Sequence, residues 1–112
     1  MTDRANIYIF QGTDYQTPLE FFDDDGPIDV SGYTFVAQIR KVYSTKKIAD
    51  FYFIMVDSEN GVVEMRVDNE VTRNLPEGKY QYDILATHPT NEVIKVLEGL
   101  IFIMPTVTKL EE

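Results

Sequence analysis

The sequence contains no cysteine and no tryptophan, and it has a single histidine. Without a thiol the chain has neither a disulfide framework nor a cysteine nucleophile, and one imidazole cannot supply the usual ligands of a zinc site. A serine–histidine–aspartate set would need His88, which stands beside Pro89 in a predicted surface turn. A general base there would be neither oriented nor sheltered. We therefore expect no enzyme, no metal and no cofactor.

Long apolar runs and an excess of cations are also missing. No segment approaches the length of a membrane span, and the apolar residues 7–10 are too few for the core of a signal peptide. Ten lysines and arginines stand against 19 aspartates and glutamates, a formal net charge of −9. This balance disfavours nucleic acid and anionic membrane surfaces, which attract basic patches. We expect a soluble domain with neither kind of partner.

The size and composition are those of one folded domain. The chain has 112 residues, of which 44% are hydrophobic and 12% aromatic, enough to form one sizeable core. It shows no internal repeat and no low-complexity linker. We predict a single domain over residues 1–112.

Alternation of apolar and polar residues predicts about seven strands, most clearly over 33–42, where Tyr33, Phe35, Ala37 and Ile39 would share a face. The other predicted strands cover 6–11, 15–23, 49–57, 62–67, 79–87 and 93–104. The faces expected to point inward are Phe51, Phe53 and Met55, then Val63, Met65 and Val67, and then Tyr80, Tyr82, Ile84 and Ala86. Asn60-Gly61 predicts a tight hairpin turn, and Gly99 suggests a bulge in the last strand. Asp68 or Asn69 could cap a single helical turn. The pattern predicts an all-β, antiparallel, immunoglobulin-like β-sandwich.

A structural corner is predicted where the chain enters the strand at 79–87. Pro76 fixes its own φ before the strand, and Gly78 permits a sharp change of direction. Tyr80 would then pack its ring inward while its hydroxyl bonds a backbone group upstream, as tyrosine corners in Greek-key sandwiches do. The corner residues are Leu75, Pro76, Gly78 and Tyr80.

Three charged groups suggest chemistry, and each has a simpler explanation. Residues 23–26 with Asp29 contain only two carboxylates in the phase of a calcium loop, so an acidic hairpin turn is the better interpretation. Asp83 and Glu98 lie on neighbouring predicted strands but are free to face solvent rather than form a catalytic pair. The basic residues near 40–47 are more simply a solvated loop than a phosphate site.

Five apolar side chains lie opposite the faces assigned to the core. They are Tyr8, Phe10, Phe22, Tyr52 and Ile54. On an isolated sandwich they would form an exposed patch, and such patches usually mark interaction surfaces. Loops or the opposite sheet could instead cover them. We interpret them as a candidate interface, for self-association or for docking to a partner.

Several segments resemble the small β-sandwich domains of tailed-phage virion proteins, such as the N-terminal domain of upper baseplate proteins. They are QGTD at 11–14, IDVSGYTF at 28–35 with QIR at 38–40, LPEGKYQYDI at 75–84, LEG at 97–99 and PTVTK at 105–109. The resemblance implies a virion structural protein of the tail or baseplate, made in the bacterial cytoplasm, with other virion proteins as partners and no catalytic residues.

The chain departs from that family in two places. Lys109 replaces the usual arginine after the final Val-Thr, and no fibre or receptor-binding region follows residues 110–112. The rival function is a carbohydrate-binding module in which Tyr8 or Tyr52 stacks on sugars. Its rings would be expected on a polar strip, whereas these are mixed with aliphatic side chains such as Ile54.

Overall fold

A computed structural model describes residues 3–44, 46–108 and 110 of the chain. The departure at Lys109 lies outside the described residues, and of residues 110–112 only Leu110 is described. The elements are β1 (Asp3–Arg4), β2 (Ile7–Phe10), β3 (Tyr15–Glu20), β4 (Phe22–Asp23), β5 (Gly26–Pro27), β6 (Thr34–Lys41), β7 (Lys47–Asp57), η1 (Ser58–Asn60), β8 (Val62–Val67), α1 (Asn69–Thr72), β9 (Gly78–Thr87) and β10 (Val93–Met104). The protein is all-β, as predicted, with seven strands of four residues or more among the described residues.

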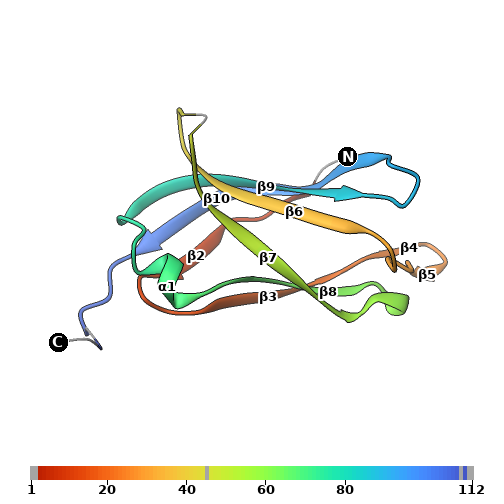
Figure 1. Cartoon of the computed structure of the whole chain (residues 1–112), viewed down its shortest axis with the longest axis horizontal. Coiled ribbons are helices and arrows are strands. Elements are labelled where there is room, and N and C mark those ends of the chain that lie inside the picture. The colour runs from red at the N-terminus through yellow and green to blue at the C-terminus, as the bar shows by residue number, and fades with distance from the viewer. Residues whose placement is uncertain (1–2, 45, 109, 111–112) are drawn as a thin grey trace.

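Two layers of strands face each other (Figure 1). In the first, here called sheet A, β1 and β2 pair with β10, which pairs with β9, then β6, then the first half of β7. The second layer, sheet B, contains the second half of β7, then β8 and β3. Strand β7 leaves sheet A after Phe51 and joins sheet B from Tyr52, so it forms the corner between the layers.

The prediction of a purely antiparallel sandwich is wrong at the N-terminal edge. Strands β1 and β2 run parallel to β10, with Ile7 opposite Ile101 and Phe10 opposite Met104. Parallel neighbours need a long connection rather than a hairpin, and here the whole domain lies between the two strands. Alternation within a single strand carries no information about which partner lies beside it.

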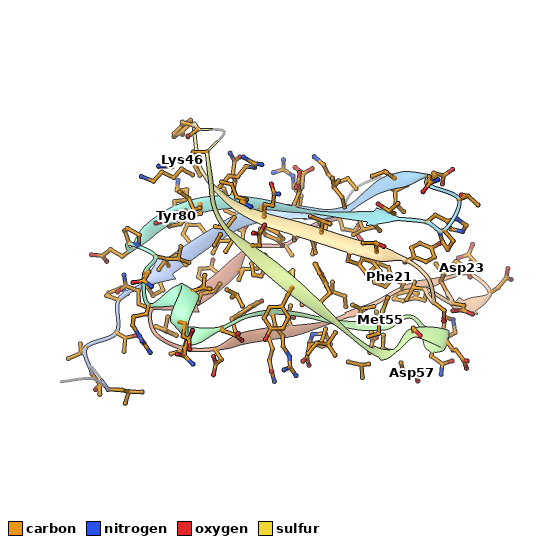
Figure 2. All side chains as sticks on the ribbon, viewed as in Figure 1. Phe21, Asp23, Lys46, Met55, Asp57 and Tyr80 are labelled. Carbon is orange, nitrogen blue, oxygen red and sulfur yellow. The ribbon has the colours of Figure 1, made fainter. Side chains whose placement is uncertain are left out.

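The inward faces of β6, β8 and β9 were predicted correctly. The core contains the predicted inner faces of β6, β8 and β9, namely Ala37, Ile39, Val63, Met65, Val67, Tyr80, Tyr82, Ile84 and Ala86. Strand β2 adds Ile7 and Ile9, and β10 adds Ile101 and Ile103. In β7, Phe51 is buried, whereas Met55, near the end of the strand (Figure 2), is 43% exposed. Met55 was expected inside.

Two turns differ from their predictions. The predicted strand 15–23 divides after Glu20, and the tiny hairpin of β4 and β5 follows, with Phe22 opposite Pro27. The β7–β8 connection is a longer turn built on η1, and of the Asn60-Gly61 pair only Gly61 has a positive φ, 74°. An Asn-Gly pair therefore occurs in turns of different length, and the two residue types alone do not predict which length forms.

The predicted bulge in β10 is real but lies three residues earlier. The register with β9 shifts between Lys95 and Leu97, which leaves Val96 as the extra residue. Gly99 has a different role: a Cβ at Gly99 would lie 2.0 Å from the carbonyl oxygen of Ala5. The glycine allows the backbone between β1 and β2 to approach β10 closely.

The predicted helical turn is present as α1, with Asp68 in the N-cap position. The Asp68 side chain makes no capping hydrogen bond. Instead, Asp14 Oδ1 accepts the backbone N–H of Asn69 at 2.7 Å. Thr72 in turn donates its hydroxyl to the carbonyl of Thr13 at 2.8 Å. α1 is thereby tied to the β2–β3 turn. None of the helices among residues 3–44, 46–108 and 110 has the length and apolarity required to cross a membrane.

Candidate functional site

The five candidate interface residues are all exposed, but the structure does not bring them together. Tyr8 and Phe10 lie on β2 in sheet A, and they are 60% and 54% exposed. Tyr52 and Ile54 lie on the part of β7 that belongs to sheet B. Phe22 stands apart on the β4–β5 hairpin. The single patch imagined from the sequence is therefore three separate surfaces.

The residues of the predicted corner contact one another and the β2–β3 turn. Tyr80 is buried, and its hydroxyl donates to the carbonyl of Pro76 at 2.7 Å. Leu75 is buried as well, and its carbonyl accepts the side-chain amide of Gln11 at 2.8 Å. Gly78 has a φ of 143°, which favours glycine. Burial raises the pKa of Tyr80 above its usual value.

His88 makes contacts that stabilise the turn in which it lies. Its ring packs edge-on against Tyr33 with the ring centroids 5.0 Å apart. Its Nδ1 accepts the backbone N–H of Thr90 at 3.1 Å and lies 2.9 Å from the Thr90 hydroxyl oxygen. These contacts hold the β9–β10 turn and give the imidazole a structural explanation.

The acidic residues of the β4–β5 hairpin also bond locally. Asp23 Oδ1 accepts the backbone N–H of Asp25 at 2.8 Å, and Asp29 Oδ1 accepts that of Ser31 at 2.9 Å. Hydrogen bonds from the side chain and then from the backbone of Ser31 lower the pKa of Asp29. Among the described residues there is no group of three or more histidine, cysteine, aspartate or glutamate side chains that could hold a metal ion.

A concavity lies on the outer face of sheet A. Its volume is about 440 Å³, and it is lined by Arg4, Asn6, Gln38, Arg40, Gln81, Tyr82, Asp83, Lys95, Glu98, Gly99 and Leu100. Because side chains alternate along a strand, burial of Ile101 and Ile103 places Leu100 and Phe102 on this outer face. We call this concavity the sheet A groove.

Side chains of the groove form rows across four strands. In one row Arg4 is opposite Glu98, Glu98 opposite Asp83, and Asp83 opposite Gln38. In the next row Leu100 is opposite Gln81, which is opposite Arg40. One row further along, Tyr8 is opposite Phe102, and their rings stack with centroids 5.1 Å apart. A polar floor therefore adjoins an aromatic end.

The two carboxylates considered for catalysis meet in this groove. Asp83 and Glu98 are direct cross-strand neighbours, and Lys95 Nζ lies 3.4 Å from Asp83 Oδ2 and 3.7 Å from Glu98 Oε1. Arg4 pairs with the other oxygen of Glu98 at 3.3 Å. The four side chains form a surface network of alternating charge, which is the environment of a structural ion-pair cluster.

The β6–β7 connection projects beyond the outer side of sheet A (Figures 1 and 2). Gln81, from the groove, holds it: its Nε2 donates to the carbonyl of Lys41 at 3.0 Å and lies 3.4 Å from that of Ser44. Tyr43 in this connection is 99% exposed and has a φ of 68°, a conformation that non-glycine residues rarely adopt. The basic residues near 40–47 are thus divided: Arg40 lines the groove, while Lys47 pairs with Asp50 at 3.1 Å.

Comparisons with known proteins give likenesses of fold only. No protein-family model matches the sequence, and no curated protein matches it. A structure from work on the multimeric cell-adhesive interactions of VGSC β subunits is 12% identical, with a TM-score of 0.45 over 94% of this chain and 93% of that one. The extracellular domain of the voltage-gated sodium channel β4 subunit, in a parallel homodimer, is 14% identical, with a TM-score of 0.37 over 98% and 90%.

An enzyme is also among the similar structures. The family 123 glycoside hydrolase from Clostridium perfringens is 13% identical, with a TM-score of 0.45, and the match covers 96% of this chain but 24% of that one. With TM-scores below 0.5, none of these likenesses supports an inference about function.

Sequence reasoning missed the groove. Its residues come from β1, β6, β9, β10 and the chain between β1 and β2, so only the register brings them together. Gln38 and Gln81 are polar positions of well-alternating strands, which by themselves predict a solvated face. The useful signal was the outward carboxylate pair Asp83 and Glu98, which marks the middle of the groove.

Proposed function

We propose that this chain is a structural domain of a tailed-phage virion, associated with the tail or baseplate, and that it works through protein–protein contacts. The resemblance of its sequence motifs to virion β-sandwich domains supports the phage assignment. One observation carries the contact role: Tyr52 and Ile54 on the outer face of sheet B are 41% and 38% exposed, and Val56, which follows them in β7, is 59% exposed. We call these three residues the sheet B strip.

The physical basis of the strip is the position of β7. From Tyr52 onward this strand belongs to sheet B, whose inner face packs against sheet A. Across the outer face, Ile54 is opposite Glu64, which is opposite Pro18. Burying a large apolar side chain is worth roughly 1.5–3 kcal/mol, so a partner gains stability by covering the strip. A second copy or another virion protein provides such cover.

Light scattering during size exclusion tests self-association through the strip. We expect an oligomer, and we expect Ile54→Asp to dissociate it because the substitution would bury a carboxylate in the contact. Val36→Asp is the matched control, since Val36 is 46% exposed on the outer face of sheet A. If Val36→Asp dissociates the oligomer and Ile54→Asp does not, the contact uses sheet A instead. A monomeric wild type leaves contact with another virion protein, tested by co-purification from assembled particles.

The proposed role involves no catalysis. Lys95 lies between Asp83 and Glu98 and contacts both, so the pair resembles a surface salt-bridge network more than an acid and a base. Turnover of a glycoside or an ester that disappears on Asp83→Asn or Glu98→Gln would contradict this part of the proposal.

We also infer that the sandwich is immunoglobulin-like. Support comes from the two-layer arrangement, in which β10, β9 and β6 are neighbours in one layer and β3 and β8 in the other. Tyr80 lies near the start of β9 and bonds the carbonyl four residues upstream, the arrangement expected of a tyrosine corner.

Carbohydrate binding remains the second candidate function, and the sheet A groove is the observation that favours it. Tyr52 fits this role poorly, because its hydroxyl donates to Asp68 at 2.7 Å on sheet B, away from the groove. Tyr8 fits better, one row from the groove floor.

A further inference from the structure

The sheet A groove has the size of a small-molecule site. Its volume of about 440 Å³ falls within the range of roughly 300–1,000 Å³ that is common for ligand pockets. The groove lies on the opposite layer from the sheet B strip, so a ligand there leaves the proposed assembly contact free. Ligand binding in the groove is consequently independent of the proposed assembly contact.

The groove offers both donors and acceptors on a scaffold that is already ordered. Arg4, Glu98, Lys95 and Asp83 hold one another by ion pairs, and their chain of contacts crosses the groove from β1 to β9. Asp83 uses Oδ2 for Lys95, which leaves Oδ1 as an acceptor among the described contacts. Gln38 accepts from Arg40 through Oε1, and its amide nitrogen remains as a donor among the described contacts.

A neutral ligand leaves the ion pairs of the groove intact. Each carboxylate already has a cationic partner, so a cationic ligand would have to break an existing pair to gain one. Arg40, which bonds to the uncharged side chain of Gln38, is the cation that an anionic ligand would use instead. Hydroxyl groups can use the same atoms without breaking any pair, because each hydroxyl both donates and accepts. A protein partner is less suited, since the centres of protein interfaces are depleted of charged residues.

A pair of stacked aromatic rings lies one row beyond the floor of the groove, and a further ring stands on the β6–β7 connection without lining the groove. Tyr8 stacks against Phe102 and is 60% exposed. Tyr43 stands in the β6–β7 connection, which Gln81 anchors to the groove, and it is 99% exposed with a left-handed φ. Residues held in rarely populated backbone conformations cluster at functional sites, and Tyr43 combines such a conformation with a fully exposed ring. Aromatic faces pack against apolar C–H surfaces, and their hydroxyls add a polar tip.

From these observations we propose that the sheet A groove binds a neutral saccharide chain. Sugar hydroxyls bond to Asp83 and Gln38 on the floor, and the C–H face of a sugar ring packs on Tyr8 at the aromatic end or on Tyr43 in the adjoining β6–β7 connection. The proposal explains together the polar floor, the paired charges and the strained, exposed tyrosine.

An array of neutral and sialylated oligosaccharides tests the proposal, with titration calorimetry on the best neutral ligand. We expect at least one neutral oligosaccharide to bind, and we expect Gln38→Ala and Tyr43→Asn each to weaken it about tenfold. Asparagine tolerates the left-handed backbone at residue 43, so this variant removes the ring without removing the turn. Phe22→Ala is the control, because Phe22 is also an exposed aromatic ring, at 70%, and lies on the distant β4–β5 hairpin.

Each result has a definite meaning. No binding to any neutral oligosaccharide overturns the proposal, as does binding that Phe22→Ala abolishes or that both groove variants leave intact. Binding only to sialylated sugars, weakening as the salt is raised from roughly 50 to 500 mM, identifies an anion site instead. Ile54→Asp should keep full saccharide affinity whether or not it changes the oligomer, so failure of the assembly role and failure of the groove are distinguishable.

Discussion

At the scale of single residues, Tyr80 joins packing to a specific polar contact. Its ring is buried in the core, and its hydroxyl bonds the Pro76 carbonyl at 2.7 Å. We expect Tyr80→Phe to keep the packing and to lower the free energy of unfolding by about 1 kcal/mol, the net value of one hydrogen bond. Midpoints of chemical denaturation measure this difference, with Tyr8→Phe as the control on an exposed ring. Equal stability of Tyr80→Phe and the wild type would show that the corner bond contributes nothing.

Tyr82 makes stability depend on pH in the alkaline range. Burial, with a smaller contribution from Tyr15, raises the pKa of Tyr82 from 10.0 to about 12, and its hydroxyl donates to the Ala5 carbonyl at 2.7 Å. Between these two pH values the unfolded chain loses the phenolic proton while the folded protein keeps it. Stability is therefore fully present below pH 10 and falls as the pH rises toward 12, by on the order of 1 kcal/mol per pH unit.

The comparison with Tyr82→Phe isolates this effect, because lysines titrate in the same range in both proteins. We expect the variant to be less stable at neutral pH, since it lacks the bond to Ala5, and to show a shallower loss of stability above pH 10. Parallel slopes of unfolding free energy against pH in the two proteins would refute the shifted pKa.

At the scale of elements, Gly99 sets how closely the N-terminal strands approach β10. A Cβ at residue 99 would meet backbone, 2.0 Å from the Ala5 carbonyl oxygen, and backbone cannot rotate out of the way as a side chain can. Gly99→Ala should therefore displace the chain between β1 and β2 and break the bond from Tyr82 to Ala5. Faster hydrogen exchange at the Ala5 amide, which donates to the Glu98 carbonyl, would report the displacement. Unchanged protection there would show that the strand adapts without moving.

Single strands were predictable from sequence because alternation records which face is buried. The inner faces of β6, β8 and β9 follow from that rule, and the bounds of β10 agree with the predicted 93–104. Pairing was not predictable in the same way. Nothing in the sequence of β2 indicates that it lies parallel to β10, and nothing in β7 marks Phe51 as the residue at which it changes sheets. These properties depend on distant segments.

The positions of the candidate surfaces were unpredictable for the same reason, because they depend on how the strands pair. Exposure of Tyr8 and Tyr52 was correctly inferred from their phase, but their positions on different sheets depend on the fold of the whole chain. The sheet A groove shows the limit most clearly. Its rows join residues as distant as Arg4 and Glu98, and only the register between strands makes them neighbours.

At the scale of the whole molecule, β2 pairs an early segment of the chain with β10, the last strand. It places Ile7 and Ile9 in the core beside β10, with exposures of 5% and 1%. Two buried isoleucines represent roughly 3–6 kcal/mol, a large part of the 5–15 kcal/mol that keeps a typical domain folded. Asn6 adds a side-chain bond, because its Oδ1 accepts the backbone N–H of Leu100 at 3.1 Å.

Removing residues 1–10 should consequently abolish cooperative folding, because β10 would lose its edge partner and the core would open to water. Removing residues 1–4 is the control: it takes away only β1, whose side chains are exposed, and the surface pair of Arg4 with Glu98, which is worth about 1 kcal/mol or less. The near-ultraviolet circular dichroism of the tyrosines, followed through thermal unfolding, distinguishes the two deletions. A sharp transition in the longer deletion, at the same temperature as in the shorter one, would mean that the remaining strands form a complete core without β2.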